Sequence, residues 1–546
     1  MRRAKDRQVV SLPAEISSAP VSQNAMPARS PFDRYLTGRW QLLALLLVAA
    51  IHFYRSPYSA SALEVPPDSV EYALAPLQVW ETGRYEIVLE GQGFPSRYPP
   101  WFPVGVILPV YAVLGPDPAN AIIPIWLFAV AGVGFAWAIG RRISGPTGGL
   151  LAALALIGVP TYSPWATQVM SDVPSTALLL AACLLFLRLR SHPGAASITG
   201  FLAAGALIAV TTLFRPVFAA MLLPFVIAAA LPWKAAALPR LVALFLPMAI
   251  AGAASLAYNA ATFGSPFRNG YHFWLSVPYD HSSMVFSLSN LGLNTESLLQ
   301  TAFPVLLAAC GLALLIARLR RVPALPHGSG QLRDMLLFTV CTCGPILCFH
   351  LIYFYPADRF FLPLLACSAV VAGGLFVRVL GQSFESLLKL LVPVALVLVI
   401  GARLAIPEPT PARRVAADAI RAHTPDDAIV VSAIDPLYLG HFAAHGSARR
   451  IVPLSRSVEY ASNVLAPKPL PYAPGGDQVV PPDALRAVTF VSVEQVPALL
   501  AEAQRGKRIF LDVSAFTPED TESFGRLKQH FRLLMRAPAL YELQPL

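Results

Sequence analysis

Charge is scarce in this sequence. Only 13% of the 546 residues are charged, while 55% are hydrophobic and the mean hydropathy is +0.57. A soluble domain carries roughly 25% charged residues, so about half of the polar surface that such a protein needs is missing. The apolar residues also gather in long runs, such as 119–140 and 387–404. This composition excludes a soluble protein and predicts a polytopic α-helical membrane protein.

Other absences narrow the range of functions. None of the six cysteines lies in a long hydrophilic segment, so no disulfide framework is expected. The sequence has no Gly-x-x-x-x-Gly-Lys loop for nucleotide hydrolysis and no His-Glu-x-x-His zinc motif. It also lacks the internal repeat on which many transporters are built. The net charge of +10 would suggest a nucleic-acid partner in a soluble protein, but here the basic residues follow the membrane, and no such partner is expected.

Hydropathy predicts eleven membrane spans, near residues 40–54, 119–140, 147–160, 174–190, 197–214, 216–232, 239–258, 298–317, 335–354, 360–378 and 387–404. The run Trp101–Leu114 is short and holds two prolines, so it is predicted to lie at the membrane face. With this count the lysines and arginines concentrate on one side, which places the N-terminus inside and the C-terminus outside. For the first span the alternative is a cleaved signal peptide, ending near Ala60-Ser61-Ala62.

Three regions are predicted along the chain. Residues 1–38 are rich in Pro, Ser and Arg and form a disordered cytoplasmic tail. Residues 39–404 form the membrane domain, with a long outer loop over 55–118. Residues 405–546 form an extracytoplasmic α/β domain, because β-rich runs near 428–434, 488–493 and 508–513 alternate with helical stretches near 411–423, 494–505 and 517–531.

Three acids on the predicted outer face are candidate functional groups. Asp68 and Glu71 lie one turn apart at the start of a predicted helix over 67–82, and Asp172 stands at the start of a span. Two carboxylates on one helix face beside a membrane suit a general base and a metal or sugar ligand. The alternative is helix capping, because Asp-x-x-Glu after proline is also a capping box, and Asp172 precedes a helix with an early proline.

Three arginines are placed against the general charge trend. Arg97 and Tyr98 precede Pro99-Pro100, Arg215 lies between two spans, and Arg359 follows Asp358. An arginine on the outer side needs a reason, and a bound phosphate is one. The alternatives are anchoring at the interface for Arg97 and Tyr98, and pairing with Asp358 or snorkelling for Arg359.

Taken in order, these segments resemble the bacterial branch of the GT-C glycosyltransferase superfamily, which includes protein O-mannosyltransferases and lipid A aminoarabinose transferases. The matching motifs are Asp68-Ser69-Val70-Glu71-Tyr72, Gly83-Arg84-Tyr85, Tyr98-Pro99-Pro100, Ser171-Asp172-Val173-Pro174, Asn259, Phe263-Gly264-Ser265-Pro266, Gly270-Tyr271 and Arg359-Phe360-Phe361-Leu362-Pro363. The sequence departs from the aminoarabinose transferases in carrying Arg97-Tyr98 where they have lysine. It departs from both subfamilies in spacing Asp68 and Glu71, where they carry an adjacent Asp-Glu pair.

The resemblance implies an enzyme of the bacterial plasma membrane that moves a sugar from a polyprenyl-phosphate carrier to a glycan, lipid or protein acceptor on the outer face, with inversion. It implies Asp68 as the general base. Glu71 and Asp172 would orient the acceptor, and in some relatives a divalent cation, Mg²⁺ or Mn²⁺, would be held by Asp68 and Asp172. The donor phosphate would be bound by Arg97, Tyr98, Arg215 and Arg359.

Two other functions stay open from the sequence. One is a transporter or flippase for a lipid-linked or small solute, which would need ionisable groups near the membrane midplane. The other is a cell-envelope scaffold whose C-terminal domain binds a cell-wall partner.

Overall fold

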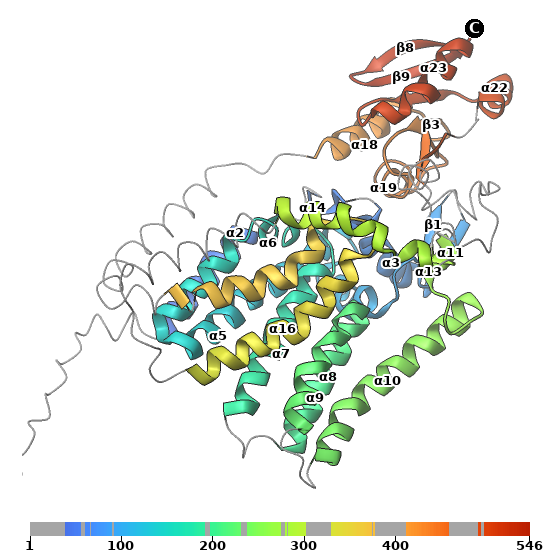
Figure 1. The fold of residues 1–546 in the computed structure, drawn as a ribbon. Coiled ribbons are helices and arrows are strands. Elements are labelled where there is room, and N and C mark those ends of the chain that lie inside the picture. Colours follow the sequence, from blue (N-terminus) through green and yellow to red (C-terminus); the bar gives the residue numbers. More distant parts are fainter. Residues whose placement is uncertain are drawn as a thin grey trace, which may run out of the picture.

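The computed structural model describes residues 39–55, 61–65, 67–89, 92–191, 197–230, 237–274, 279–280, 282–301, 329–373, 375–376, 411–457, 490–492 and 496–546. Within these ranges the chain forms a bundle of long apolar helices and a smaller α/β unit that carries the C-terminus (Figure 1). The predicted tail over 1–38 lies outside the described residues.

The bundle is built from helices that share one apolar core. They are α2 (Arg39–Phe53), α5 (Ile122–Ile157), α7 (Asp172–Ser191), α8 (Ile198–Phe214), α9 (Leu222–Ala230), α10 (Ala237–Phe263) and α16 (Ser329–Leu351). By length and composition, four described helices can cross a membrane, namely Pro118–Ile157, Asp172–Ser191, Ala237–Phe263 and Gly330–Leu351. The predicted span 387–404 and most of 298–317 lie outside the described residues, so the count of eleven stays a prediction.

Helix α5 contains a reversal that separates two predicted spans. Its backbone is non-helical at Ser144 and Gly145, and Gly145 has a φ of +76°, which glycine adopts without steric cost. A Cβ atom on Gly140 would lie 2.4 Å from the carbonyl oxygen of Gly148 and 2.5 Å from the Cβ of Ala152. Residues twelve apart in a straight helix would be separated by roughly 18 Å, so the two halves fold back on each other. Small residues at the crossing allow this close approach.

The loop between α2 and α5 has its own structure. It contains the short 3-10 turn η2 (Ser61–Leu63), α3 (Asp68–Thr82), the hairpin β1 (Glu86–Leu89) and β2 (Gln92–Pro95), the π-helical turn η3 (Pro103–Ile107) and α4 (Leu108–Leu114). Helix α3 ends at Gly83, whose φ of +76° lets its N–H reach the carbonyl of Val79. The apolar face of α3 packs on η3 and α4, so the segment predicted to lie at the membrane face is helical and supports α3 from its buried side.

Short elements complete the end of the bundle that carries this loop. They are η4 (Pro118–Ala121), α6 (Tyr162–Trp165), η5 (Pro216–Met221), α11 (Gly270–Trp274), α13 (Ser282–Val285), η6 (Leu288–Asn290), α14 (Leu291–Thr301) and η7 (Asp358–Phe361). Residues 362–373 follow η7 as a helix.

The C-terminal unit is a five-stranded sheet with helices on both faces. Its order is β4-β3-β7-β9-β8, in which β3 (Ile429–Ser432), β4 (Arg450–Pro453) and β7 (Ile509–Asp512) are parallel. The antiparallel hairpin β8 (Phe531–Ala537) and β9 (Leu540–Pro545) extends the sheet beside β7. The strands β5 (Ser455–Ser457) and β6 (Phe490–Ser492) form a separate antiparallel pair.

The two faces of this sheet bury different cores. Val430 and Phe510 point to the side of α18 (Ala412–His423) and α19 (Pro436–Phe442), in the same core as α3 and the loop of the bundle. Their neighbours Val431 and Leu511 point to the side of α22 (Val496–Gln504) and α23 (Thr521–His530). Because side chains alternate along a strand, one sheet face docks on the membrane part and the other closes the domain core.

Candidate active site

Helix α3 presents its two acids to the turn that follows the β1–β2 hairpin. Asp68 and Glu71 lie one turn apart on a buried face of α3, as predicted. Pro67, the residue before the helix, makes no side-chain cap, and both carboxylates instead meet Arg97. The capping-box alternative considered from the sequence is therefore wrong for this pair.

Arg97 joins the two acids with one guanidinium group. Its Nη2 atom lies 2.9 Å from Asp68 Oδ1 and 3.1 Å from Glu71 Oε2. The backbone N–H of Arg97 and the hydroxyl of Ser96 both donate to Glu71 Oε1. Because Arg97 is only 3% exposed and Glu71 only 1%, this is a desolvated ion pair rather than an interfacial anchor.

Arg359 occupies the second oxygen of Asp68. Its Nη2 atom lies 2.8 Å from Asp68 Oδ2, and its guanidinium carbon stands 5.3 Å from the ring centre of Trp165. Neighbouring Asp358 accepts the backbone N–H of Arg359 and the indole N–H of Trp165. The side chain of Arg359 thus neither pairs with Asp358 nor snorkels away, and both alternatives for this residue are wrong.

Asp172 and Arg215 form a second ion pair beside the first. Arg215 Nη1 lies 2.5 Å from Asp172 Oδ1. Asp172 is 2% exposed, and its Oδ2 atom has no hydrogen-bond partner among the described residues. The Asp172 side chain therefore does not cap α7, and one buried carboxylate oxygen stays available to a ligand.

Aromatic side chains connect the two pairs. Arg215 and Arg359 both stand over the ring of Phe360, at 5.7 and 5.6 Å from its centre. Tyr72 stacks on Tyr98 with ring centres 4.2 Å apart, and its hydroxyl lies 3.0 Å from the hydroxyl of Ser171. The structure thus brings together the predicted site residues, which we call the acid–arginine cluster: Asp68, Glu71, Arg97, Asp172, Arg215 and Arg359, with Tyr98 packed against it.

Burial and ion pairing act in opposite directions on the two acids of α3. Burial by itself would raise the pKa of Asp68, but the guanidinium groups of Arg97 and Arg359 outweigh it, so the pKa is lowered from 3.8. For Glu71, burial is the larger effect, and its pKa is raised from 4.5 in spite of Arg97. Asp68 is therefore an ionised but weakly basic carboxylate in this conformation.

The divalent cation considered from the sequence does not fit this arrangement. Both oxygens of Asp68 accept a guanidinium N–H, and Asp172 is joined to Arg215. Hard cations such as Mg²⁺ take several oxygen ligands, which arginine cannot supply. Among the described residues, no group of three or more His, Cys, Asp or Glu side chains is placed to hold a metal.

Several residues of the site were not identified as such from the sequence. Ser96 and Tyr72 act through hydroxyl groups, and Phe360 acts through its ring face. Gly270 lies against the backbone of Arg97, where a Cβ atom would come within 2.4 Å of the Arg97 carbonyl oxygen. The motif Gly270-Tyr271 was the one signal for this contact, because glycine allows backbone segments to approach closely.

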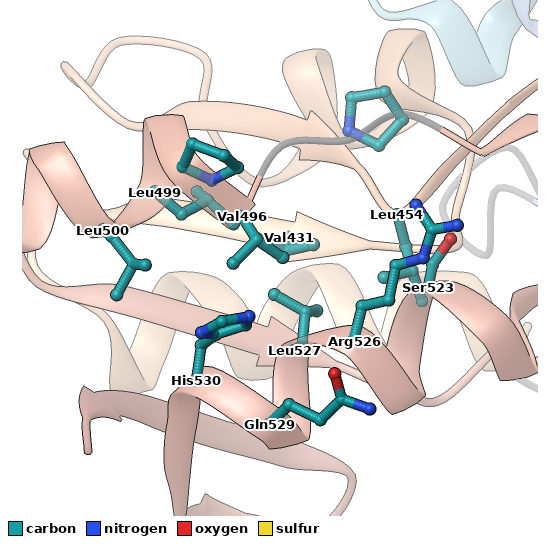
Figure 2. A pocket seen from close by; sticks show the side chains of 12 residues that line it. Val431, Leu454, Val496, Leu499, Leu500, Ser523, Arg526, Leu527, Gln529 and His530 are labelled. Atoms are coloured by element: carbon teal, nitrogen blue, oxygen red, sulfur yellow. The ribbon is translucent and has the colours of Figure 1, made fainter.

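A separate cavity of about 440 Å³ lies in the C-terminal unit, on the sheet face that points away from the docked side. Figure 2 shows its apolar lining, with Ser523, Arg526 and His530 contributed by α23. Among the described residues its lining contains no acid, and the acid–arginine cluster is formed by residues of the helical bundle and its loops. We assign no chemistry to this cavity.

Comparisons with known proteins find one matching family model and several similar solved structures. Residues 100–259 match the family model described as dolichyl-phosphate-mannose-protein mannosyltransferase. No curated protein sequence matches the chain.

Solved structures match over nearly the whole chain. ArnT from Cupriavidus metallidurans bound to undecaprenyl phosphate is 14% identical, with 92% of this chain and 97% of that chain covered and a TM-score of 0.56. The apo state of the same protein is also 14% identical, with 92% of this chain and 97% of that chain covered and a TM-score of 0.54. AglB from Archaeoglobus fulgidus, in complex with an inhibitory peptide and a dolichol-phosphate, is 12% identical. The match covers 95% of this chain and 75% of that chain, with a TM-score of 0.48.

At 14% identity the likeness to ArnT shows the fold, and it extends over both the helical bundle and the C-terminal unit. The family match covers the part of the bundle that begins beside Arg97 and includes Asp172 and Arg215. The chain thus has the fold of ArnT, and its match to the mannosyltransferase family model over residues 100–259 agrees with the resemblance to the GT-C superfamily found in the sequence.

Proposed function

We propose that the protein transfers a sugar from a polyprenyl-phosphate carrier to an acceptor hydroxyl, with Asp68 as the general base. The observation that carries this proposal is the buried acid–arginine cluster, in which three carboxylates and three guanidinium groups meet in a GT-C fold. The match to a dolichyl-phosphate-mannose-dependent family and the likeness to ArnT bound to undecaprenyl phosphate support a lipid-linked donor.

The reaction is a direct displacement at the anomeric carbon. Asp68 accepts the proton of the acceptor hydroxyl while the oxygen of that hydroxyl bonds to the anomeric carbon. The bond between that carbon and the phosphate oxygen breaks, its electron pair leaves with polyprenyl phosphate, and the anomeric configuration inverts. The leaving phosphate gains one negative charge in this step, and arginine is suited to stabilise it.

Binding of the donor requires an exchange of partners within the cluster. The three acids neutralise the three arginines, so the described cluster offers a phosphate no unpaired positive charge. The donor phosphate therefore binds by drawing Arg97 or Arg359 away from Asp68. Loss of a guanidinium partner raises the pKa of Asp68 toward the range of a useful base, so the carboxylate is released when the donor is in place.

The other two acids have different parts in this scheme. Glu71 is fully hydrogen-bonded by Arg97 and Ser96, so it holds Arg97 rather than orienting the acceptor. Asp172 keeps one oxygen without a partner among the described residues, and this oxygen can accept a hydrogen bond from a hydroxyl of the sugar or of the acceptor.

The position of the charges favours an enzyme over a transporter. Asp172 is the first residue of α7, Arg215 stands between α8 and η5, and Arg359 lies in η7 before the following helix. These are ends of membrane helices, whereas a transporter needs ionisable groups near the midplane. We place the site on the outer face of the bacterial plasma membrane, with the C-terminal unit on the same side.

Mass spectrometry of a deletion strain tests the proposal. The strain is expected to accumulate a polyprenyl-phosphate sugar and to lack one sugar from an envelope glycan, lipid or protein, and the intact gene is expected to reverse both changes. Unchanged profiles of lipid-linked sugars and of the envelope would contradict it.

A further inference from the structure

The segment 61–65 lies where the C-terminal unit meets both acid-bearing parts of the bundle. Arg413, on α18, donates from Nη1 to the carbonyl oxygen of Glu64 at 2.8 Å and to its carboxylate at 3.4 Å. The backbone N–H of Glu64 donates to Gln168 Oε1 at 3.2 Å, and the carbonyl of Ala62 accepts the N–H of Val169 at 3.0 Å. One short strip of backbone is thus held from two sides.

The same segment is hydrogen-bonded to the first turn of the helix that carries Asp68. The carbonyl of Val65 accepts the backbone N–H of Ser69 at 2.8 Å and its hydroxyl at 2.9 Å. The hydroxyl of Ser69 lies 3.1 Å from the N–H of Val65. A displacement of Glu64 therefore passes to the first turn of α3 through three hydrogen bonds.

On the other side, the segment leads to Asp172. Gln168 and Val169 lie four and three residues before Asp172 in the connection that opens α7. Segment 61–65 consequently links the two acids that the proposed mechanism uses.

An apolar contact supports the Arg413 bond. Ala62 and Leu63 are buried in one core with Val169 and with Ile420, Leu437 and Tyr438 of the C-terminal unit. Arg413 sits at the edge of this core, with 26% of its side chain exposed. This core holds the C-terminal unit on the bundle. The hydrogen bond from Arg413 to the carbonyl oxygen of Glu64 then fixes the position of segment 61–65 on the core.

We infer that Arg413 is a positioning residue through which the C-terminal unit fixes the separation of Asp68 and Asp172. This inference rests on the proposed function, because it matters to turnover only if those acids act on the substrates. Arg413 makes no described contact with the acid–arginine cluster, so it acts through segment 61–65. The C-terminal unit then has a part in catalysis without carrying a reacting group.

Arg413→Ala and Arg413→Lys test this role in the full-length protein, with Arg505→Ala as the matched control. Arg505 is 72% exposed and pairs with Glu502 on the far side of the C-terminal unit. Turnover is read as release of polyprenyl phosphate from a lipid extract of the deletion strain, and binding is read with polyprenyl phosphate alone. Hydrogen exchange reports the amides of 61–72.

Arg413→Ala is expected to lower turnover about ten- to a hundredfold, the cost of misplacing a catalytic group by roughly 1 Å. Polyprenyl phosphate should bind as to the wild type, because the arginines of the cluster are intact, and the 61–72 amides should exchange faster. Arg413→Lys should recover most of the turnover, because an ammonium group can still donate to the Glu64 carbonyl.

Two results would overturn the inference. Wild-type turnover in Arg413→Ala, with faster exchange of the 61–72 amides, would show that the segment need not be held. Unchanged exchange would show that Arg413 does not hold it. If Asp68→Asn also keeps wild-type turnover, the proposed function itself is wrong. If Asp68→Asn loses turnover while Arg413→Ala keeps it, only the role of Arg413 is wrong.

Discussion

Replacing Asp68 by asparagine is expected to tighten the binding of polyprenyl phosphate while abolishing transfer. Asp68 holds Arg97 and Arg359 through contacts of 2.9 and 2.8 Å, and the proposed donor phosphate competes for the same two guanidinium groups. The neutral amide of asparagine has the same size but no negative charge, so it competes less strongly with the phosphate for the two arginines. Most substitutions in a substrate site weaken binding, so the opposite direction is a sharp test.

The contacts set the size of the effect. A net hydrogen bond to a charged group contributes about 1.5–3 kcal/mol. The amide oxygen introduced by Asp68→Asn can still accept a hydrogen bond from one arginine. The side chain at position 68, which competes with the phosphate, therefore loses one charged hydrogen bond. Since about 1.4 kcal/mol corresponds to a tenfold change, Asp68→Asn should bind polyprenyl phosphate about ten- to a hundredfold more tightly.

Equilibrium binding of a labelled polyprenyl phosphate to the protein in lipid nanodiscs measures this change. Asp280→Asn is the matched control, because Asp280 is partly exposed and pairs with Arg268 outside the cluster. The corresponding polyprenol, which has no phosphate, should bind the wild type and Asp68→Asn equally. Equal or weaker binding of polyprenyl phosphate by Asp68→Asn would refute the exchange of partners.

Two further predictions concern the supports of the cluster. Gly270→Ala should displace Arg97 and lower the rate of sugar transfer, because the new Cβ would lie 2.4 Å from the Arg97 carbonyl oxygen. The control Gly292→Ala has open space around the new Cβ and should leave the rate unchanged. A normal rate in Gly270→Ala would contradict this prediction. Because the pKa of Glu71 is raised in the folded state, its protonation favours folding, and wild-type stability should fall as the pH rises from 4.5 through the raised value. Thermal unfolding measured against pH should show no such fall in stability for Glu71→Gln. This variant should still lose stability below pH 3.8, because the pKa of Asp68 is lowered in the folded state. A fall as large as that of the wild type in Glu71→Gln would show that Glu71 is not its source.

The sequence was sufficient to identify the members of the cluster but not their pairing. Periodicity places Asp68 and Glu71 on one face of a helix, and the helix Asp68–Thr82 confirms this. Whether an acid caps its own helix or reaches another segment depends on what packs against it. Arg359 lies 291 residues from Asp68 along the chain, and no local pattern encodes that contact.

The uncharged members of the site were harder to predict for a different reason. Ser96 and Tyr72 belong to residue types that are common in loops and membrane interfaces, and they act only because Glu71 and Ser171 lie within hydrogen-bond distance. Their contribution depends on tertiary geometry, which a single sequence does not display.

In the C-terminal unit, buried strands were easier to predict than the edge hairpin. The strands Ile429–Ser432 and Ile509–Asp512 are buried along their whole length and lie within the β-rich runs noted in the sequence. The hairpin over 531–545 has no clear signal in the sequence, because its first strand is only partly buried and carries charges between apolar residues. Such a pattern is weak over so few residues.

The most direct test of the central claim is complementation of the deletion strain by Asp68→Asn. The wild-type gene and Asp280→Asn are expected to restore the missing envelope sugar, while Asp68→Asn, although it still inserts and folds, is expected not to restore it. Restoration of the sugar by Asp68→Asn would show that Asp68 is not the general base, and would contradict the mechanism proposed for the acid–arginine cluster.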